Sequence, residues 1–274
     1  MRRRALAITI ALLAALALGR QGPVAQAVQF LWADYRAWAH CRDLSRVEGP
    51  HFFVLYPSGY EAEARLILRL AERGRSEVAR VFGSEPRGKI RVILHPSPDD
   101  MAAMWRWPGG RTAAGAYLGG TLSVLAGGSE AELYGVLVHE ITHLFVDELG
   151  RGRSPRWLSE GLAQLLEAEL AGPLYVAPVE IAWPPPDSGD WRPLDALFAD
   201  PRRQDEAYLR SLVLASRLVD ELGHGGVAAV LEHMGRGMSF EGAFKRVSGT
   251  AWADQLDLWA RQRGEGSPGG REKY

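Results

Sequence analysis

The residue pattern with the clearest chemical meaning is His139-Glu140-Ile141-Thr142-His143, which has the form H-E-x-x-H. Two histidines four residues apart on a helix lie one turn apart on the same face, so their ring nitrogens can bind one metal ion. The glutamate between them is placed to take a proton from a water molecule that the ion polarises. The pattern predicts metal-assisted hydrolysis, with His139 and His143 as ligands and Glu140 as the general base. Two unconnected histidines on a helix surface or in a core are the alternative.

A catalytic metal ion needs a third protein ligand. The metzincin spacing requires Gly at 146 and His at 149, and the chain has Val146 and Leu149, which excludes that spacing. Asp147 lies on the same helical stripe but about 12 Å along the axis from His139, so it is better placed to support a histidine ring. We expect the third ligand to be Glu160, which lies in the apolar run WLSEGLA. A solvated surface acid is the alternative role for Glu160.

The available donors favour one Zn²⁺ ion, although two imidazoles and one carboxylate also suit other divalent metals. The chain has a single cysteine, Cys41. This excludes a disulfide framework and zinc sites built from clustered thiolates. Any metal ion must therefore be held by histidine and carboxylate side chains.

Two successive helices must position these residues, and both leave signals in the sequence. Ser129 and Glu132 form an S-x-x-E capping box ahead of the motif, and Gly150 is a stop signal after it. Ser154 and Pro155 then predict the N-cap and first residue of the helix that carries the expected third ligand.

The remaining segments predict a β-rich first half and an α-rich second half. Strands are expected over 51–56 and 89–94, with a helix over 61–82 between them and a glycine-rich hairpin over 109–128. From residue 129 onward nearly everything has helical periodicity, apart from a proline-rich loop. Segregated elements of this kind predict an α+β fold rather than a doubly wound sheet.

The motif and its spacing resemble a known family. HEITH, followed after sixteen residues by Glu160 in WLSEGLAQ, is similar to the gluzincin metallopeptidases. It most resembles the bacterial peptidase MA-like group, whose pattern is HExxH followed by W-L-x-E-G-x-A, and the resemblance covers roughly residues 48–263. It implies a zincin-like fold and one catalytic zinc ion held by His139, His143 and Glu160. Glu140 would be the general base.

Two further residue patterns refine what the resemblance implies. Tyr208 resembles the tyrosine that such enzymes supply to the developing oxyanion, although a half-buried tyrosine that packs a helix is the alternative. The related zinc aminopeptidases carry G-A-M-E-N, whereas this chain has Gly115-Ala116-Tyr117-Leu118-Gly119 there, with no acid. An endopeptidase is therefore favoured, with an edge strand within Thr121–Leu125 pairing with the substrate backbone.

Two other function classes stay open at this point. The chain could be a zinc hydrolase of a non-peptide amide, or a catalytically inactive zincin-like binding module. Lys and Arg number 32 against 33 Asp and Glu, a net charge of −1, so no basic field predicts nucleic-acid binding. The expected partner is a peptide or protein substrate, and the oligomeric state is left open.

Residues 1–27 have the features of a signal peptide. A basic start, Met1–Arg4, precedes an uncharged stretch, Ala5–Leu18, and Ala25-Gln26-Ala27 offers a cleavage site. The uncharged stretch is shorter than the roughly 20 residues that span a bilayer, so no stable membrane span is expected after cleavage. These features predict a periplasmic or secreted protein.

The expected domain organisation follows from these segments. After the signal peptide, we expect a helical segment or linker over 28–48 and one zincin-like metallopeptidase domain over 49–263. The tail over 264–274 is rich in glycine and charge and is expected to be disordered.

Overall fold

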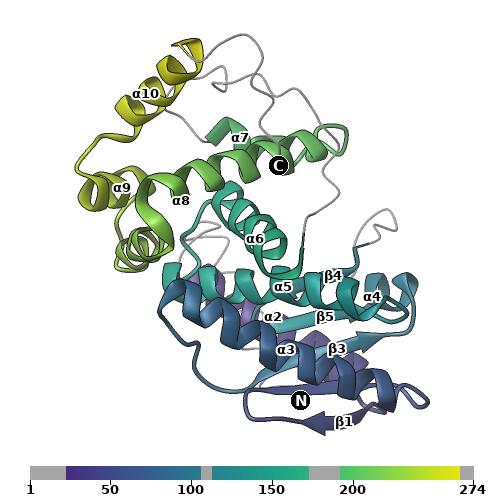
Figure 1. Cartoon of the computed structure of the whole chain (residues 1–274). Coiled ribbons are helices and arrows are strands. Elements are labelled where there is room, and N and C mark those ends of the chain that lie inside the picture. Colours follow the sequence, from purple (N-terminus) through teal and green to yellow (C-terminus); the bar gives the residue numbers. More distant parts are fainter. Residues whose placement is uncertain (1–22, 106–112, 173–191, 266–274) are drawn as a thin grey trace. The chain divides into compact units, whose positions relative to one another are not determined.

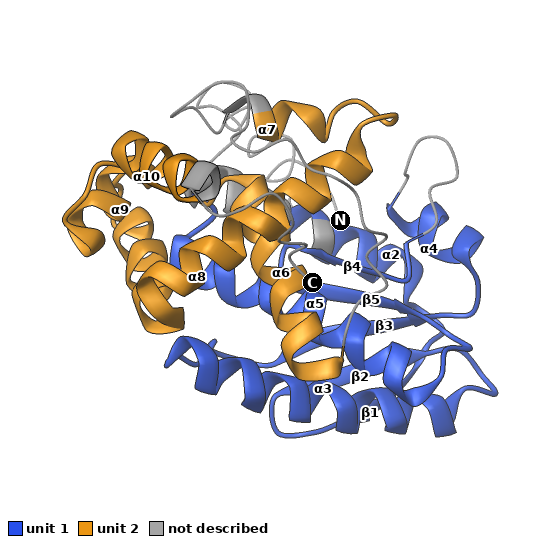
Figure 2. Ribbon diagram, turned by 45° about the horizontal axis from the view of Figure 1, so that its top comes forward, with its two compact units in different colours: residues 1–153 blue, residues 154–274 orange. Residues whose placement is uncertain are grey.

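The computed structural model describes residues 23–105, 113–172 and 192–265 (Figure 1). The chain divides into two compact units, residues 1–153 and residues 154–274 (Figure 2). Each unit has its own secondary structure and its own buried core.

Several expected segments fall wholly or partly outside the described residues. These are most of the signal peptide (1–22), part of the glycine-rich segment (106–112), nearly all of the proline-rich loop (173–191) and most of the tail (266–274). The first described helix, α2 (Pro23–His40), runs through the expected cleavage point after Ala27. Among the described helices, none combines the length and apolarity that a membrane crossing requires.

Unit 1 is built on a mixed five-stranded sheet with the strand order β1-β2-β3-β5-β4. β3 is central and pairs in parallel with β2 and β5, whereas β1 and β4 pair antiparallel at the two edges. The strands are β1 (Ser45–Glu48), β2 (Phe52–Tyr56), β3 (Ile90–His95), β4 (Gly115–Leu118) and β5 (Thr121–Leu125). The strands expected around β2 and β3 and the hairpin expected around β4 and β5 are confirmed, and β1 is an addition within segment 28–48.

The alternation of side chains along β3 separates two layers of helices. Ile93 packs in an apolar cluster with side chains of α2 and α4. Neighbouring residues of a strand point to opposite faces, so Val92 and Leu94 face the other layer, formed by α3 and α5. The helices of unit 1 are α2, α3 (Glu61–Phe82), α4 (Pro98–Trp105) and α5 (Glu130–Gly150).

Helix α5 forms where the sequence predicts it. The Ser129 hydroxyl accepts a hydrogen bond from the Glu132 backbone N–H, and the Glu132 side chain accepts one from the Ser129 N–H, which is the expected capping box. The helix ends at Gly150, and Arg151 caps it in the left-handed region with φ 48°. Contacts with α3, such as Phe82 against Phe145, bury its apolar side.

Unit 2 consists of helices in the described part of the chain. They are α6 (Arg156–Ala171), α7 (Arg192–Leu197), α8 (Gln204–Gly235, interrupted at Gly223), α9 (Phe240–Ser248) and α10 (Trp252–Glu265). Trp157 of α6 packs on Phe240 and Trp252, which joins three helices in one aromatic core. With the sheet of unit 1, these helices confirm the predicted α+β class and the mostly helical C-terminal half.

The start of α6 differs from the expectation. The sequence predicts Ser154 as N-cap, but the N-cap position is Pro155, without a side-chain hydrogen bond. The backbone N–H groups of Arg156 and Trp157 instead donate to the carboxylate of Asp195 on α7, at 2.9 and 2.8 Å. A carboxylate from another helix therefore satisfies the helix start, and local sequence cannot reveal such a partner.

Candidate metal centre

Helix α5 brings together the two histidines of the motif. The rings of His139 and His143 lie edge to face with centroids 4.9 Å apart, and both side chains are partly exposed. The neighbouring Val138 and Ile141 are completely buried. The imidazoles thus occupy a narrow polar stripe beside buried apolar side chains, as the spacing predicts.

Glu140 is buried and lies close to the backbone of strand β4. Its exposed fraction is only 6%. A Cβ atom added to Gly115 of β4 would lie 2.9 Å from Glu140 Oε1 and 2.5 Å from Val136 Cγ1. The strand can approach the carboxylate this closely because position 115 is a glycine.

The strand beside Glu140 is not the one that the sequence suggested as the edge. Thr121–Leu125 forms β5, which lies between β3 and β4, so the expectation of an edge strand there is wrong. The edge on this side is β4, because the hairpin folds outward from the sheet and places its first strand outermost. A hairpin pattern in sequence does not tell which of its two strands pairs with the rest of the sheet.

Strand β4 is tied to α5 by a partly buried hydrogen bond. The Tyr117 hydroxyl donates to Asp147 Oδ2 at 2.8 Å. Burial raises the pKa of Tyr117 well above its ordinary value, and the negative charge of Asp147 adds to this effect. Tyr117 therefore stays protonated as a donor and holds the edge strand to the helix one turn beyond His143. Support of a histidine by Asp147 stays a prediction.

In unit 2, helix α6 places Glu160 in a buried setting. Its exposed fraction is 9%, which does not fit the alternative of a solvated surface acid. Arg156, one turn earlier, donates from Nε to Glu160 Oε1 at 3.1 Å. The next residue, Gly161, packs so closely on α8 that an added Cβ would overlap the carbonyl oxygen of Ser211.

Tyr208 lies near the start of α8 in the same unit. Its ring packs edge to face on Phe198 with centroids 5.1 Å apart, and its carbonyl oxygen accepts a hydrogen bond from Gln164 Nε2 at 2.9 Å. These contacts tie this part of α8 to α6 and to the residue that follows α7. Its role toward an oxyanion stays a prediction.

Among the described residues, two groups of three side chains have the residue types that could hold a metal ion. One group is His139, His143 and Glu160, the set that the sequence predicts. The two histidines belong to unit 1 and the glutamate to unit 2, so coordination of one ion by all three is an inference.

The second group is His40, His95 and Asp100, all within unit 1, and sequence reasoning did not find it. Its members come from α2, β3 and α4, and no short spacing links the first to the other two. His95 and Asp100 lie five residues apart, at the end of β3 and in the first turn of α4, and only the docking of α2 brings His40 to them.

Comparison with known proteins adds no support to the resemblance to gluzincin metallopeptidases. No family model matches this chain, and no curated protein matches it. The gluzincin prediction therefore depends on the H-E-x-x-H helix and on Glu160.

Proposed function

We propose that this chain is a zinc-dependent metallopeptidase that cleaves internal peptide bonds. The observation that carries the proposal is the pair of contacting imidazoles on α5 beside the buried carboxylate of Glu140. Two imidazoles one turn apart on a helix, with a carboxylate between them, are the residue types that metal-assisted hydrolysis requires. The fold is proposed to be zincin-like.

The donor set fits a catalytic zinc ion. Two imidazoles and one carboxylate are a common ligand set for catalytic zinc, with a fourth position left for water or substrate. The buried carboxylate of Glu160 in unit 2 is the proposed third ligand beside His139 and His143 of unit 1. When bound, the ion polarises the scissile carbonyl and lowers the pKa of water toward about 7.

Glu140 supplies the proton transfer. Its carboxylate accepts the proton of the attacking water and then delivers it to the nitrogen of the leaving amine. The close approach of Gly115 excludes solvent from one side of this carboxylate. Tyr208 is the proposed hydrogen-bond donor to the oxyanion.

Edge strand β4 is the proposed site of substrate alignment. The outer edge of a terminal strand presents backbone N–H and C=O groups that can pair with an extended peptide. β4 carries Gly115 next to Glu140, so a peptide paired there would run past the general base. An extended peptide can continue in both directions along an edge, which favours cleavage within a chain. A peptide or protein outside the cytoplasm is the proposed substrate.

A pair of matched variants of the full chain tests the proposal. Glu140→Gln should lower the rate of peptide-library cleavage by about 10²–10⁴-fold, because it removes the general base, while the zinc content stays unchanged. Glu148→Gln changes an exposed glutamate of the same helix and should leave both unchanged. Equal rates for the wild type and Glu140→Gln would refute the mechanism. Hydrolysis of another amide without peptide cleavage would refute the peptidase assignment but not the zinc chemistry.

A further inference from the structure

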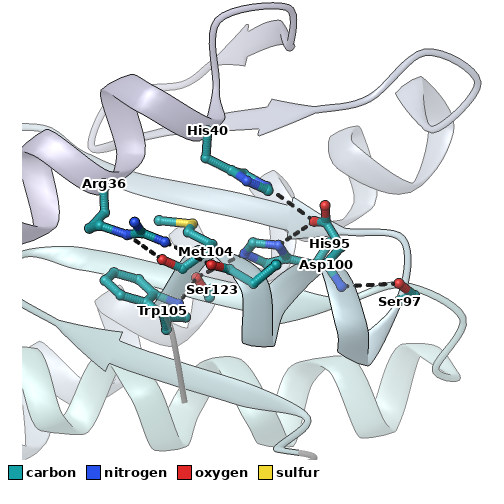
Figure 3. Close-up of polar contacts among 9 residues, drawn as sticks. Arg36, His40, His95, Ser97, Asp100, Met104, Trp105 and Ser123 are labelled. Carbon is teal, nitrogen blue, oxygen red and sulfur yellow. Dashed lines mark hydrogen bonds and ion pairs between the residues drawn. The ribbon is translucent and has the colours of Figure 1, made fainter. Parts of the chain in front are cut away.

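A second convergence of metal-binding side chains lies on the opposite face of the sheet from α5. His40 ends α2, His95 ends β3, and Asp100 lies in the first turn of α4 (Figure 3). The Asp100 Oδ2 atom is 2.7 Å from His95 Nδ1 and 3.2 Å from His40 Nε2. One carboxylate oxygen and two ring nitrogens from three elements thus meet at one point.

The ring of His95 is held in a fixed orientation. Its Nε2 atom lies 3.1 Å from the hydroxyl of Ser123, and that hydroxyl accepts a hydrogen bond from Trp105 Nε1 at 2.9 Å. His95 and Ser123 are completely buried. Metal-binding histidines commonly have their second ring nitrogen bound in this way, which turns the first nitrogen toward the ion.

The order Ser123, His95, Asp100 also resembles the hydrogen-bond chain of a serine hydrolase. Ser123, however, has an exposed fraction of 0%, and its hydroxyl is hydrogen-bonded to the indole of Trp105. No substrate carbonyl can therefore reach it. Nucleophilic catalysis by this chain of residues is therefore excluded in the folded unit.

The open side of the group faces solvent. The side chains of His40 and Asp100 have exposed fractions of 23% and 31%. The backbone N–H of Asp100 donates to Ser97 Oγ at 3.2 Å, which caps α4 and orients its first turn. An ion therefore has an entry path, and water can complete its coordination.

Other contacts position α2 independently of His40. Arg36 donates from Nε to the carbonyl of Met104 at 2.5 Å and from Nη2 to that of Ala103 at 2.7 Å, which caps the end of α4 (Figure 3). Asp34 pairs with Arg91 of β3 at 2.9 Å. Since these contacts already dock the helix, His40 reaches the group without any help from an ion.

We propose that His40, His95 and Asp100 form a second binding site for a divalent transition-metal ion of the zinc type. Ligand atoms around tetrahedral zinc lie about 3.3 Å apart, given bond lengths of about 2.0–2.1 Å. The separations of 2.7 and 3.2 Å require only small side-chain movements to admit the ion. The ion takes the place of the protons now shared within the group, and the Nε2 proton of His95 is donated to Ser123. It joins α2 to α4 and β3, a structural role distinct from the proposed catalysis.

The test measures zinc bound per full-length chain after dialysis against low zinc concentrations. His139→Ala/His143→Ala should retain one ion, and adding His40→Ala or Asp100→Asn should remove it. His51→Ala is the matched control, because His51 Nδ1 pairs with Glu72 at 2.8 Å outside both groups, and it should leave the ion in place. In the double variant, Ser123→Ala should weaken zinc binding by about 10–100-fold, since it frees the ring of His95.

The outcomes separate this inference from the proposed function. No ion in the double variant, or an ion retained after both His40→Ala and Asp100→Asn, overturns the second site. If the wild type binds one ion in total, and that ion is lost with His40→Ala but not with the two α5 substitutions, the second site is supported and the proposed catalytic centre is refuted. Added zinc should also raise the thermal unfolding midpoint of His139→Ala/His143→Ala. It should not raise the midpoint of the same protein when it also carries His40→Ala. Circular dichroism of each variant checks that it is folded.

Discussion

The two groups of possible metal ligands have the same chemical composition but differ in access and assembly. Each consists of two histidines and one carboxylate. On α5 both imidazoles are partly exposed beside an edge strand, whereas His95 of the other group is completely buried and bound to Ser123. Ligand types alone therefore do not separate a catalytic centre from a structural one. The two are separated by whether a substrate can reach the site and whether a general base lies beside it.

The largest expected effect would separate the two groups directly. Glu160→Gln should lower peptide cleavage by more than about 100-fold, because losing a ligand should exceed the 10–100-fold effect of losing a residue that only supports one. Asp100→Asn makes the same chemical change in the other group and should leave cleavage unchanged. Cleavage kinetics and bound zinc, measured on both full-length variants, provide the check. Equal losses in the two variants would mean that the division between catalysis and structure is wrong.

The α5 group can be predicted from the sequence because its two histidines lie close together in the chain, within one helix. The spacing of His139 and His143 places both rings on one helical face, and the capping box that begins at Ser129 defines where the helix starts. The apolar run around Glu160 favours a metal ligand over a solvated surface acid, and its 9% exposure does not fit the solvated acid. Strand and helix periodicities likewise predict β2, α3 and β3.

The features that the sequence misses depend on contacts between distant segments. His40 and His95 are 55 positions apart, and only the docking of α2 on the sheet brings them together. Asp195 caps α6 from nearly 40 positions away, at a separation that no capping rule covers. The edge position of β4 results from the pairing of β5, rather than β4, with β3. The turn residues of the hairpin do not determine which of the two strands pairs with β3.

A smaller effect is expected from Tyr208, and it tests the proposed oxyanion role of this residue. Tyr208→Phe should lower kcat by about 100-fold if its hydroxyl stabilises the oxyanion, with little change in KM or bound zinc. Tyr35→Phe changes an exposed tyrosine of α2 and serves as the control. An unchanged kcat would assign the Tyr208 ring to packing, as in its contact with Phe198.

The smallest effect is expected from the close approach of β4 to Glu140. Gly115→Ala keeps an allowed backbone conformation but pushes a methyl group against Glu140 and Val136. Since a displacement of about 1 Å in a catalytic group can cost about 100-fold, we expect this smaller shift to lower kcat by about tenfold. Gly225→Ala, where an added Cβ meets no atom within 4 Å, should leave kcat unchanged. Zinc bound at the His40 group should be the same in both variants, because neither substitution touches α2 or α4. A Gly115→Ala protein with full kcat would show that the edge strand does not position the general base.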